Sequence, residues 1–386
     1  MTTEHFDVAV VGAGLVGAAI AHELARAGAS TLVLEAGPEP APGASRSNSG
    51  ILHTGFDSPP GTLETELILE QGRLWRPLFD ELGIPYRETG ALLVASDEEQ
   101  LERLPGIAEN AERNGVEVRL LNEQQTRQLE PGAAAKGSLL VPGEAITDPF
   151  EVTRRLLCTG AVSRYGWRVQ RVVEGPAGAE VDGERGRISA GFVINCAGLY
   201  GDEVSGDDSF NITARRGEFV VFAKGSASLV EHILLPVPSP YSKGVLVFPT
   251  IYGYLCAGPS AIDQDDKEDW RPRRDCLEEV RQRAGNLFPP LLELDRVNAW
   301  AGLRPVGQPR NYIIEWSRST PSLLNVAAIR STGLSACLGI ARHVLAMLRE
   351  RGLEVKPSVS RTEIPDLEPE PWWERLNSLR NVGTPC

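Results

Sequence analysis

A glycine-rich turn near the N-terminus constrains the fold of this chain more than any other feature of its sequence. The apolar run Phe6–Val11 leads into GAGLVG at residues 12–17, and a helical pattern follows as far as about Gly28. A second apolar run, Thr31–Leu34, comes next. A strand, a helix and a second strand within about thirty residues form a βαβ unit, which places the two strands parallel in one sheet.

The spacing of the three glycines predicts a nucleotide-binding turn. The first allows a tight turn, the second lets the backbone approach a pyrophosphate, and the third lets the helix pack closely on the strand. The N–H groups at the start of the helix suit a phosphate charge, and the acid that ends the second strand can accept hydrogen bonds from a ribose. The expected contacts with a dinucleotide are Gly12, Gly14, Leu15, Val16, Gly17, Glu35 and Ala36.

The rest of the chain favours FAD over a nicotinamide as this dinucleotide. An enzyme that moves hydride from NAD(P)H onto a flavin usually has a second glycine fingerprint, and CAGLYG at residues 196–201 lacks its spacing. The apolar strand Phe192–Cys196 ends instead in Ala197 and Gly198, which is typical of a second cofactor-contacting segment in FAD proteins. Ala197 and Gly198 are therefore predicted cofactor contacts.

Composition narrows the class of protein. The 386 residues suggest two intertwined domains, and a formal charge of −13 disfavours a nucleic-acid partner, which needs clustered Lys and Arg. No stretch approaches the roughly 18 apolar residues of a membrane span. The six cysteines form no metal-binding spacing, and no basic leader precedes the first strand. We therefore expect free thiols, no metal site and a cytoplasmic protein.

A second motif, ASRSNSGILHTG at residues 44–55, resembles that of a known family. It is similar to the flavin-facing S-x-x-N-S-G-x-x-H-x-G motif of the D-amino-acid-oxidase-type FAD-dependent oxidoreductases. Within that family it is most similar to the glycerol-3-phosphate dehydrogenase and L-2-hydroxyglutarate oxidase group. The resemblance extends through most of the chain, over residues 90–92, 148–150, 214–218, 244–250 and 301–305.

The resemblance implies that FAD is bound non-covalently along this motif and at the start of the last helix. Hydroxyl and amide groups of the motif would donate to the cofactor, and a helix N-terminus directed at the flavin would stabilise its anionic reduced form. Read alone, residues 331–336 are only a capped helix start. The implied contacts are Ser45, Arg46, Ser47, Asn48, Ser49, Gly302, Thr332, Gly333, Leu334 and Ser335.

His53 is the candidate catalytic base. The resemblance implies that it lies beside the flavin and takes the proton of a substrate hydroxyl while hydride passes to flavin N5. An imidazole suits this task because its ordinary pKa of about 6.5 leaves it mostly neutral at physiological pH. The alternative is a histidine that serves only as a hydrogen-bonding spacer in a glycine-rich loop.

Arg304 is the candidate anchor for an anionic substrate, and it also counts among the catalytic residues. The family resemblance places an arginine after A-G-L at a strand end, where a guanidinium can form two parallel bonds to a carboxylate or phosphate. A structural salt bridge at the strand end is the alternative. Arg216 is a second predicted substrate-binding cation, and Arg46 is a further cation near the expected site.

The expected fold class is α/β, with a Rossmann-type FAD-binding domain and a substrate domain built on a mostly antiparallel sheet. Residues 1–80, 145–212 and 300–355 are assigned to the first, and 81–144 and 213–299 to the second. Within them we expect helices at Leu63–Leu82 and from Gly333 to about Arg351, with Ser96 and Asn122 as caps of two others. The tail at 356–386 is expected to pack as an irregular strap or to fray.

The predicted reaction is oxidation of the CH–OH group of a small polar substrate, a 2-hydroxy acid or a polyol phosphate, to a ketone. Oxygen or an electron carrier would accept the electrons. Two alternatives stay open: oxidation of an amine or amino acid on the same fold, and a flavin-binding subunit without turnover. The sequence Phe56-Asp57-Ser58, which replaces an aromatic pair common in the family, leaves the substrate itself open.

Overall fold

Two large sheets organise the chain in the computed structural model, which describes residues 4–238, 244–355, 364 and 367–380. The first sheet contains the predicted βαβ unit, and its five parallel strands follow the order β9-β2-β1-β12-β20. A hairpin and one further strand extend it with antiparallel pairs. Its strands are β1 His5–Val11, β2 Thr31–Leu34, β9 Val162–Arg164, β10 Val169–Gly175, β11 Gly178–Gly183, β12 Gly186–Asn195, β19 Ile313–Trp316 and β20 Leu323–Ala327.

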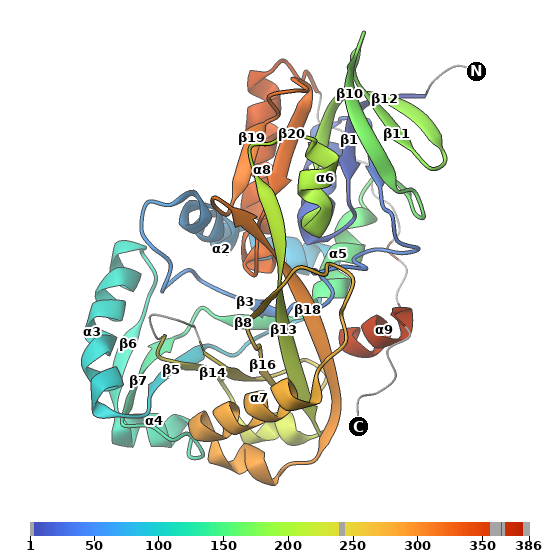
Figure 1. The fold of residues 1–386 in the computed structure, drawn as a ribbon. Helices are drawn as coiled ribbons and strands as arrows, with labels where there is room; N and C mark the ends of the chain where they lie inside the picture. The colour runs from blue at the N-terminus through green and yellow to red at the C-terminus, as the bar shows by residue number, and fades with distance from the viewer. Residues whose placement is uncertain (1–3, 239–243, 356–363, 365–366, 381–386) are drawn as a thin grey trace.

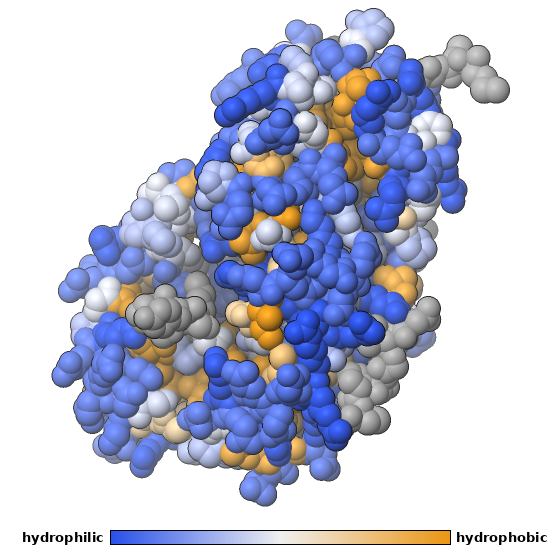
Figure 2. Space-filling model, in the orientation of Figure 1, coloured by the Kyte–Doolittle hydropathy of each residue, from blue (hydrophilic) through white to orange (hydrophobic). Residues whose placement is uncertain are grey.

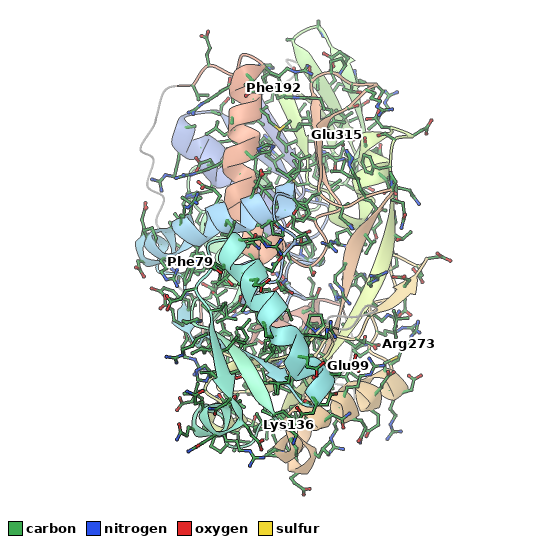
Figure 3. The ribbon with its side chains drawn as sticks, turned by 90° about the vertical axis from the view of Figure 1, so that its left-hand side faces the viewer. Phe79, Glu99, Lys136, Phe192, Arg273 and Glu315 are labelled. Carbon is green, nitrogen blue, oxygen red and sulfur yellow. The ribbon has the colours of Figure 1, made fainter. Side chains whose placement is uncertain are left out.

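Partly buried helices pack on and around this first sheet. The first, α1, has an apolar face rich in small residues and ends at Gly28, whose φ of 96° is left-handed and suits glycine. In Figure 3, α2, which carries Phe79, crosses α8. A Cβ on Gly339 would lie 2.2 Å from the Leu67 carbonyl oxygen, so the backbones of the two helices are in direct contact. The helices are α1 Leu15–Ala27, α2 Leu63–Leu82, α5 Pro149–Leu157, α6 Gly201–Ser205 and α8 Gly333–Glu350.

The second sheet is mostly antiparallel, as predicted, with β14 against β5 as the parallel exception. Figure 1 shows its two longest strands, β13 and β18, side by side along the length of the molecule. The expected domain boundaries at 212/213 and 299/300 fall inside these two strands, and the domain division stays a prediction. The strands are β5 Ala91–Ala95, β6 Arg119–Asn122, β7 Gly137–Val141, β13 Asn211–Phe222, β14 Ile233–Pro236, β15 Leu246–Pro249, β16 Leu255–Gly258, β17 Ile262–Gln264 and β18 Arg296–Gln308.

A short third sheet, ordered β3-β8-β4, completes the architecture together with helices that pack on the second sheet. Hydrophilic residues cover most of the face seen in Figure 2, and apolar residues reach it in small separate areas. Among the described residues, no helix is both long and apolar enough to cross a membrane. The remaining elements are β3 Ile51–Leu52, β4 Tyr86–Glu88, β8 Ala145–Thr147, α3 Glu98–Arg113, α4 Glu123–Leu129, α7 Arg274–Leu287, η1 Gly198–Tyr200, η2 Ser226–Leu229 and η3 Pro289–Glu293.

Two predicted helix caps have different outcomes. The Asn122 side chain accepts from the Gln125 backbone N–H at 2.9 Å, and the Gln125 side chain accepts in return from the Asn122 N–H, so the predicted capping box is confirmed. The prediction of Ser96 as a cap is wrong by one residue. Asp97 caps α3 because its carboxylate accepts from the backbone N–H of Gln100 at 2.8 Å.

The C-terminal tail holds a helix that sequence patterning did not predict, α9 at Trp372–Leu379. Trp372 and Trp373 are buried, and Trp373 stacks on Trp300 of β18 with ring centroids 5.4 Å apart. The expectation of an irregular strap or a frayed end is therefore wrong here, because two adjacent indoles anchor this turn of helix in the core. The parts of the expected tail at 356–363, 365–366 and 381–386 lie outside the described residues.

Candidate active site

The glycine turn has the close approaches that its sequence predicts. Gly12 has a φ of 104°, and a Cβ there would lie 2.4 Å from the carbonyl oxygen of Cys196. A Cβ on Gly17 would lie 2.0 Å from the carbonyl oxygen of Gly12, so helix α1 can start here only without a side chain. Glu35 accepts from the Ala13 N–H at 2.8 Å, which joins the end of β2 to the turn. Ala197 and Gly198 directly follow Cys196 and lie beside this turn.

The serine-rich motif at residues 44–49 lies against the start of α1. The Ser45 hydroxyl accepts from the Leu15 N–H at 2.9 Å, and a Cβ on Gly14 would come within 2.8 Å of that oxygen. The first turn of α1 contains no acidic residue. A helix N-terminus with glycine beside it and a hydroxyl on its N–H groups is a suitable place for a phosphate group.

The same motif reaches the other predicted cofactor segments. The Ser47 carbonyl accepts from the indole N–H of Trp300 at 3.1 Å, and a Cβ on Gly302 would lie 2.5 Å from the Ser47 hydroxyl. The Asn48 amide donates to the carbonyl of Ser331, just before α8, at 3.3 Å. Four predicted segments that are far apart in sequence therefore lie together: the glycine turn, the serine motif, Gly302 and the start of α8.

The start of α8 has no side-chain cap and lies beside the carboxylate of Glu64. The Thr332 side chain makes no capping bond to the helix, and the first turn contains no acidic residue. The Thr332 hydroxyl instead donates to Glu64 at 2.8 Å and pairs with the Tyr312 hydroxyl at 2.7 Å. The Leu334 carbonyl accepts from the Gln71 amide, and the Ser335 hydroxyl accepts from the backbone N–H of His53 at 2.8 Å.

His53 lies at the end of β3 and pairs with a buried carboxylate. Its Nδ1 is 2.8 Å from Oε2 of Glu144, and its side chain is 31% exposed, whereas that of Glu144 is fully buried. The other carboxylate oxygen of Glu144 accepts from both the N–H and the hydroxyl of Thr54, at 2.8 and 2.9 Å. These bonds fix the ring of His53 from one side.

Sequence reasoning missed Glu144. It lies in the turn that joins β7 to β8, and a glutamate that follows a glycine in such a turn is usually exposed to solvent. The one signal available was that this acid stands alone between two apolar strands. Its partner, Thr54, is some ninety positions away in sequence, and only the pairing of β3 with β8 brings the two together.

Arg304 projects from β18 toward β13, and its guanidinium rests on backbone carbonyls. It donates to the carbonyls of Arg216 at 3.1 Å and Ser260 at 2.6 Å. Burial, with a smaller contribution from the nearby charge of Arg215, lowers the pKa of Arg304 to about 10, so it remains a cation at neutral pH. Among the residues that the structure describes, no carboxylate lies within ion-pair distance of Arg304.

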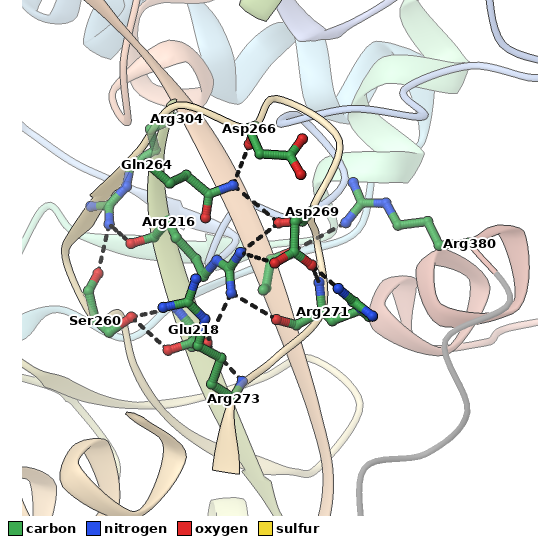
Figure 4. Close-up of polar contacts among 11 residues, drawn as sticks. Arg216, Glu218, Ser260, Gln264, Asp266, Asp269, Arg271, Arg273, Arg304 and Arg380 are labelled. Atoms are coloured by element: carbon green, nitrogen blue, oxygen red, sulfur yellow. Dashed lines mark hydrogen bonds and ion pairs between the residues drawn. The ribbon is translucent and has the colours of Figure 1, made fainter. Parts of the chain in front are cut away.

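Arg216, the other predicted substrate-binding arginine, lies in an internal network (Figure 4). Its fully buried guanidinium pairs with Asp269 at 2.7 Å and donates to the carbonyl of Arg271 at 3.0 Å. This bond and that from Arg271 hold the pKa of Asp269 well below its ordinary value. Side chains alternate along β13, and the register sets Arg215, not Arg216, opposite Arg304. Arg216 therefore has no part in the site proposed below.

Arg46 has a similar outcome. Its buried side chain pairs with Glu39, donates to the Pro40 carbonyl, and lies over the ring of Phe150 at 4.2 Å. These contacts hold the loop that precedes the serine motif, so the cation predicted near the site serves the protein's own framework. The backbone of Arg46 still lies within the motif, between Ser45 and Ser47.

The residues present fit FAD. The glycine turn and the Ser45 hydroxyl provide room and donors for a diphosphate, Glu35 stands where a ribose would be held, and α8 presents its N-terminus. Cys337, a conceivable covalent attachment point, is fully buried inside α8. Burial raises the pKa of its thiol to about 12, which disfavours the nucleophilic thiolate.

Comparison with known proteins agrees with this geometry. The model of the FAD dependent oxidoreductase family matches residues 7–347. The chain belongs to this family. The family, the FAD cofactor and the α/β fold predicted from sequence are thereby confirmed, and the chain is an FAD-dependent oxidoreductase.

Individual members of the family share its length and fold to different degrees. A glycerol 3-phosphate dehydrogenase of Caloramator mitchellensis is 30% identical over 357 residues, which cover 89% of this chain and 74% of the relative. An L-2-hydroxyglutarate dehydrogenase of Escherichia coli O17:K52:H18 is 29% identical over 281 residues, covering 69% and 67%. The structure of a dithionite-reduced L-α-glycerophosphate oxidase of Mycoplasma pneumoniae with FAD bound gives a TM-score of 0.87 at 25% identity, over 95% of this chain and 99% of that chain.

Proposed function

We propose that this flavoprotein oxidises the CH–OH group of a small anionic substrate, a 2-hydroxy acid or a polyol phosphate, to the ketone. The observation that carries the proposal is the pairing of His53 with the buried carboxylate of Glu144, next to the start of α8. The relatives named for glycerol 3-phosphate and for L-2-hydroxyglutarate support the substrate class, because both compounds join a secondary alcohol to an anionic group.

His53 is the proposed catalytic base. Non-covalently bound FAD would supply the two-electron acceptor for the hydride that leaves the substrate carbon. His53 removes the hydroxyl proton, so that the electrons of the O–H bond can form the carbonyl. Its partial exposure suits contact with a diffusing substrate, and the bond from its own N–H to Ser335 ties it to α8.

Arg304 is the proposed anchor for the substrate's anionic group. A buried guanidinium that donates to neutral carbonyls has no ion-pair partner among the described residues, and a bound carboxylate or phosphate would provide one. Such a charge-assisted contact fixes the orientation of the substrate as well as its affinity.

The proposal also includes the electron acceptor and the cellular compartment. We assign the reoxidation of the flavin to oxygen or to an electron carrier. We place the reaction in the cytoplasm, because the five cysteines in the described part of the chain are all free thiols, as in a reducing compartment.

Anaerobic photometric titration tests the proposal. The holoenzyme is mixed with glycerol 3-phosphate, a series of 2-hydroxy acids and a series of amino acids, and the flavin absorbance is followed. We expect bleaching by one or more of the hydroxy compounds and none by amino acids. Bleaching by amino acids alone would replace the proposal with amine oxidation, and no bleaching by any compound would favour a binding-only protein. Admission of oxygen, with detection of hydrogen peroxide, then identifies the acceptor.

A further inference from the structure

Glu144 is a buried acid that the proposed reaction does not yet use. Its side chain is fully buried although it lies in a turn, and within the described part of the chain the ring of His53, when protonated, is its one cationic partner. Its carboxylate forms hydrogen bonds with the ring Nδ1 of His53 and with the N–H and the hydroxyl of Thr54. Burying a carboxylate costs free energy that its hydrogen bonds must offset. The bond to His53 therefore points to a function of this carboxylate.

We propose that Glu144 is a positioning residue that keeps the ring proton of His53 on Nδ1 and thereby places the basic lone pair on Nε2. This inference rests on the proposed role of His53 as the base. A carboxylate oxygen can only accept, so Oε2 at 2.8 Å from Nδ1 selects the tautomer in which Nδ1 carries hydrogen. Glu144 thus fixes both the orientation of the ring and the atom that receives the substrate proton.

The same geometry assigns Glu144 a role during turnover. The hydroxyl proton of the substrate is transferred to Nε2, and the electrons of the O–H bond form the carbonyl as hydride leaves the substrate carbon. Bound FAD would accept that hydride. His53 then carries two ring protons and a positive charge, and the carboxylate beside Nδ1 stabilises that charge. The proton can leave to solvent once the ketone has gone, because the ring is partly exposed.

Thr54 makes the substitution Glu144→Gln diagnostic. The N–H of Thr54 requires an acceptor, so the amide oxygen of the new glutamine must take the place of Oε1. The amide NH₂ group then faces Nδ1 and donates to it, which moves the ring proton to Nε2 and removes the base. If Glu144 set the tautomer, Glu144→Gln would be slower than Glu144→Ala. If Glu144 served only for packing, Glu144→Gln would be the faster of the two, because glutamine has the shape of glutamate and alanine does not.

The chain offers a matched control in a second buried pair of the same kind. Glu130 is 1% exposed, and its carboxylate lies 2.9 Å from Nδ1 of His232 while accepting from the backbone N–H groups of residues 231 and 232. His232 precedes β14 in the second sheet, and within the described part of the chain neither member of this pair hydrogen-bonds to His53, Thr54 or Glu144. All three bonds go to the same oxygen, Oε1, so the amide oxygen of Glu130→Gln can keep them. Glu130→Gln therefore makes the same substitution beside a different histidine, without forcing a change of tautomer there.

The test combines flavin reduction with the ¹⁵N NMR spectrum of histidine-labelled holoenzyme, which has five histidines. His53→Ala identifies the His53 signals. We expect the wild type to show a protonated Nδ1 and Glu144→Gln a protonated Nε2, with anaerobic flavin reduction slowed about 10²- to 10⁴-fold. Glu144→Ala, which leaves the ring free to adopt either tautomer, should be less impaired than Glu144→Gln. Glu130→Gln should leave the rate unchanged.

Each other outcome has a definite meaning. A wild-type His53 protonated on Nε2 overturns the inference without any variant, so it remains testable even if Glu144→Gln fails to fold. A slow Glu144→Gln variant with an unchanged tautomer also overturns it, since the effect would then be structural. If His53→Ala itself reduces its flavin at the wild-type rate, His53 is not the base, and its positioning by Glu144 fails with it; the proposed function as a whole fails only if no hydroxy compound reduces the wild-type flavin. If His53→Ala is inactive and Glu144→Gln is normal, only the positioning role fails.

Discussion

The cofactor end and the substrate end of the site are built by different means. At the cofactor end, glycines allow the backbone of the turn, α1 and β12 to approach within distances that exclude a side chain. At the proposed substrate end, the candidate residues His53, Glu144 and Arg304 follow β3, lie in the turn after β7, and lie in β18, and hydrogen bonds orient their side chains. The cofactor end depends on glycines that have no side chain, and the substrate end depends on contacts between residues that are far apart in sequence. The two ends should therefore fail differently when mutated.

Gly17→Ala should have the largest effect. Its Cβ would lie 2.0 Å from the Gly12 carbonyl oxygen, so α1 must move away from the turn and the nucleotide site is lost. We expect purified protein without flavin and without activity, measured by the ratio of absorbance at flavin and protein wavelengths. Gly72→Ala in α2, where a Cβ meets nothing within 4 Å, should keep its flavin. A Gly17→Ala protein with a full complement of FAD would show that the turn is not the binding element.

This contrast explains what could be predicted from sequence. The turn, the βαβ unit and FAD are encoded locally, because glycine spacing reports backbone geometry directly. His53 was found through its motif, but Glu144 was not, because nothing near it in sequence marks its burial. Nothing in the sequence near Arg216 and Arg304 shows that Asp269, some fifty residues after Arg216, neutralises Arg216 and not Arg304. The helix α9 was missed for the same reason, since its partner Trp300 lies far away in the chain.

Trp373→Ala tests whether the cofactor end also depends on a distant side chain. Trp373 stacks on Trp300, and the indole N–H of Trp300 donates to the Ser47 carbonyl in the serine motif. Removing this buried indole should cost about 3–5 kcal/mol of unfolding free energy. Urea unfolding followed by circular dichroism measures the loss, and a weaker FAD affinity should accompany it. Leu367→Ala, at a side chain that is 42% exposed, should stay within about 0.5 kcal/mol.

Arg304→Gln probes the substrate end alone. We expect KM for the anionic substrate to rise about 100-fold, or about 2–3 kcal/mol, with flavin content and Tm nearly unchanged. Steady-state kinetics and the flavin spectrum measure the two parts separately. Arg215→Gln is the matched control, because Arg215 lies opposite Arg304 but pairs with Asp263 at the surface, and KM should change less than about threefold. Equal effects of the two substitutions would argue against an anchor at Arg304.

Asp148 is a buried acid outside both ends, and its replacement should have the smallest effect. It caps α5, accepts from the Tyr252 hydroxyl at 2.5 Å, and is fully buried, which raises its pKa to about 6. The unfolded chain has an aspartate pKa of about 3.9, so the folded protein binds this proton more tightly. The contribution of Asp148 to stability is therefore most favourable below about pH 4 and is lost as the pH rises to about 6.

Asp148→Asn should accordingly stabilise the protein at pH 7.5 and not at pH 4. The asparagine oxygen can keep the bonds from the N–H groups of Phe150 and Glu151, while its NH₂ group donates to the oxygen of Tyr252. Because the charge-assisted bond to Tyr252 is weakened, we expect a net gain of only about 1 kcal/mol, read from Tm at the two pH values. Asp97→Asn makes the same exchange at an exposed cap and serves as the comparison. A gain at pH 4 as large as that at pH 7.5 would mean that the buried charge is not the cause, and that the substitution acts through packing or hydrogen bonding instead.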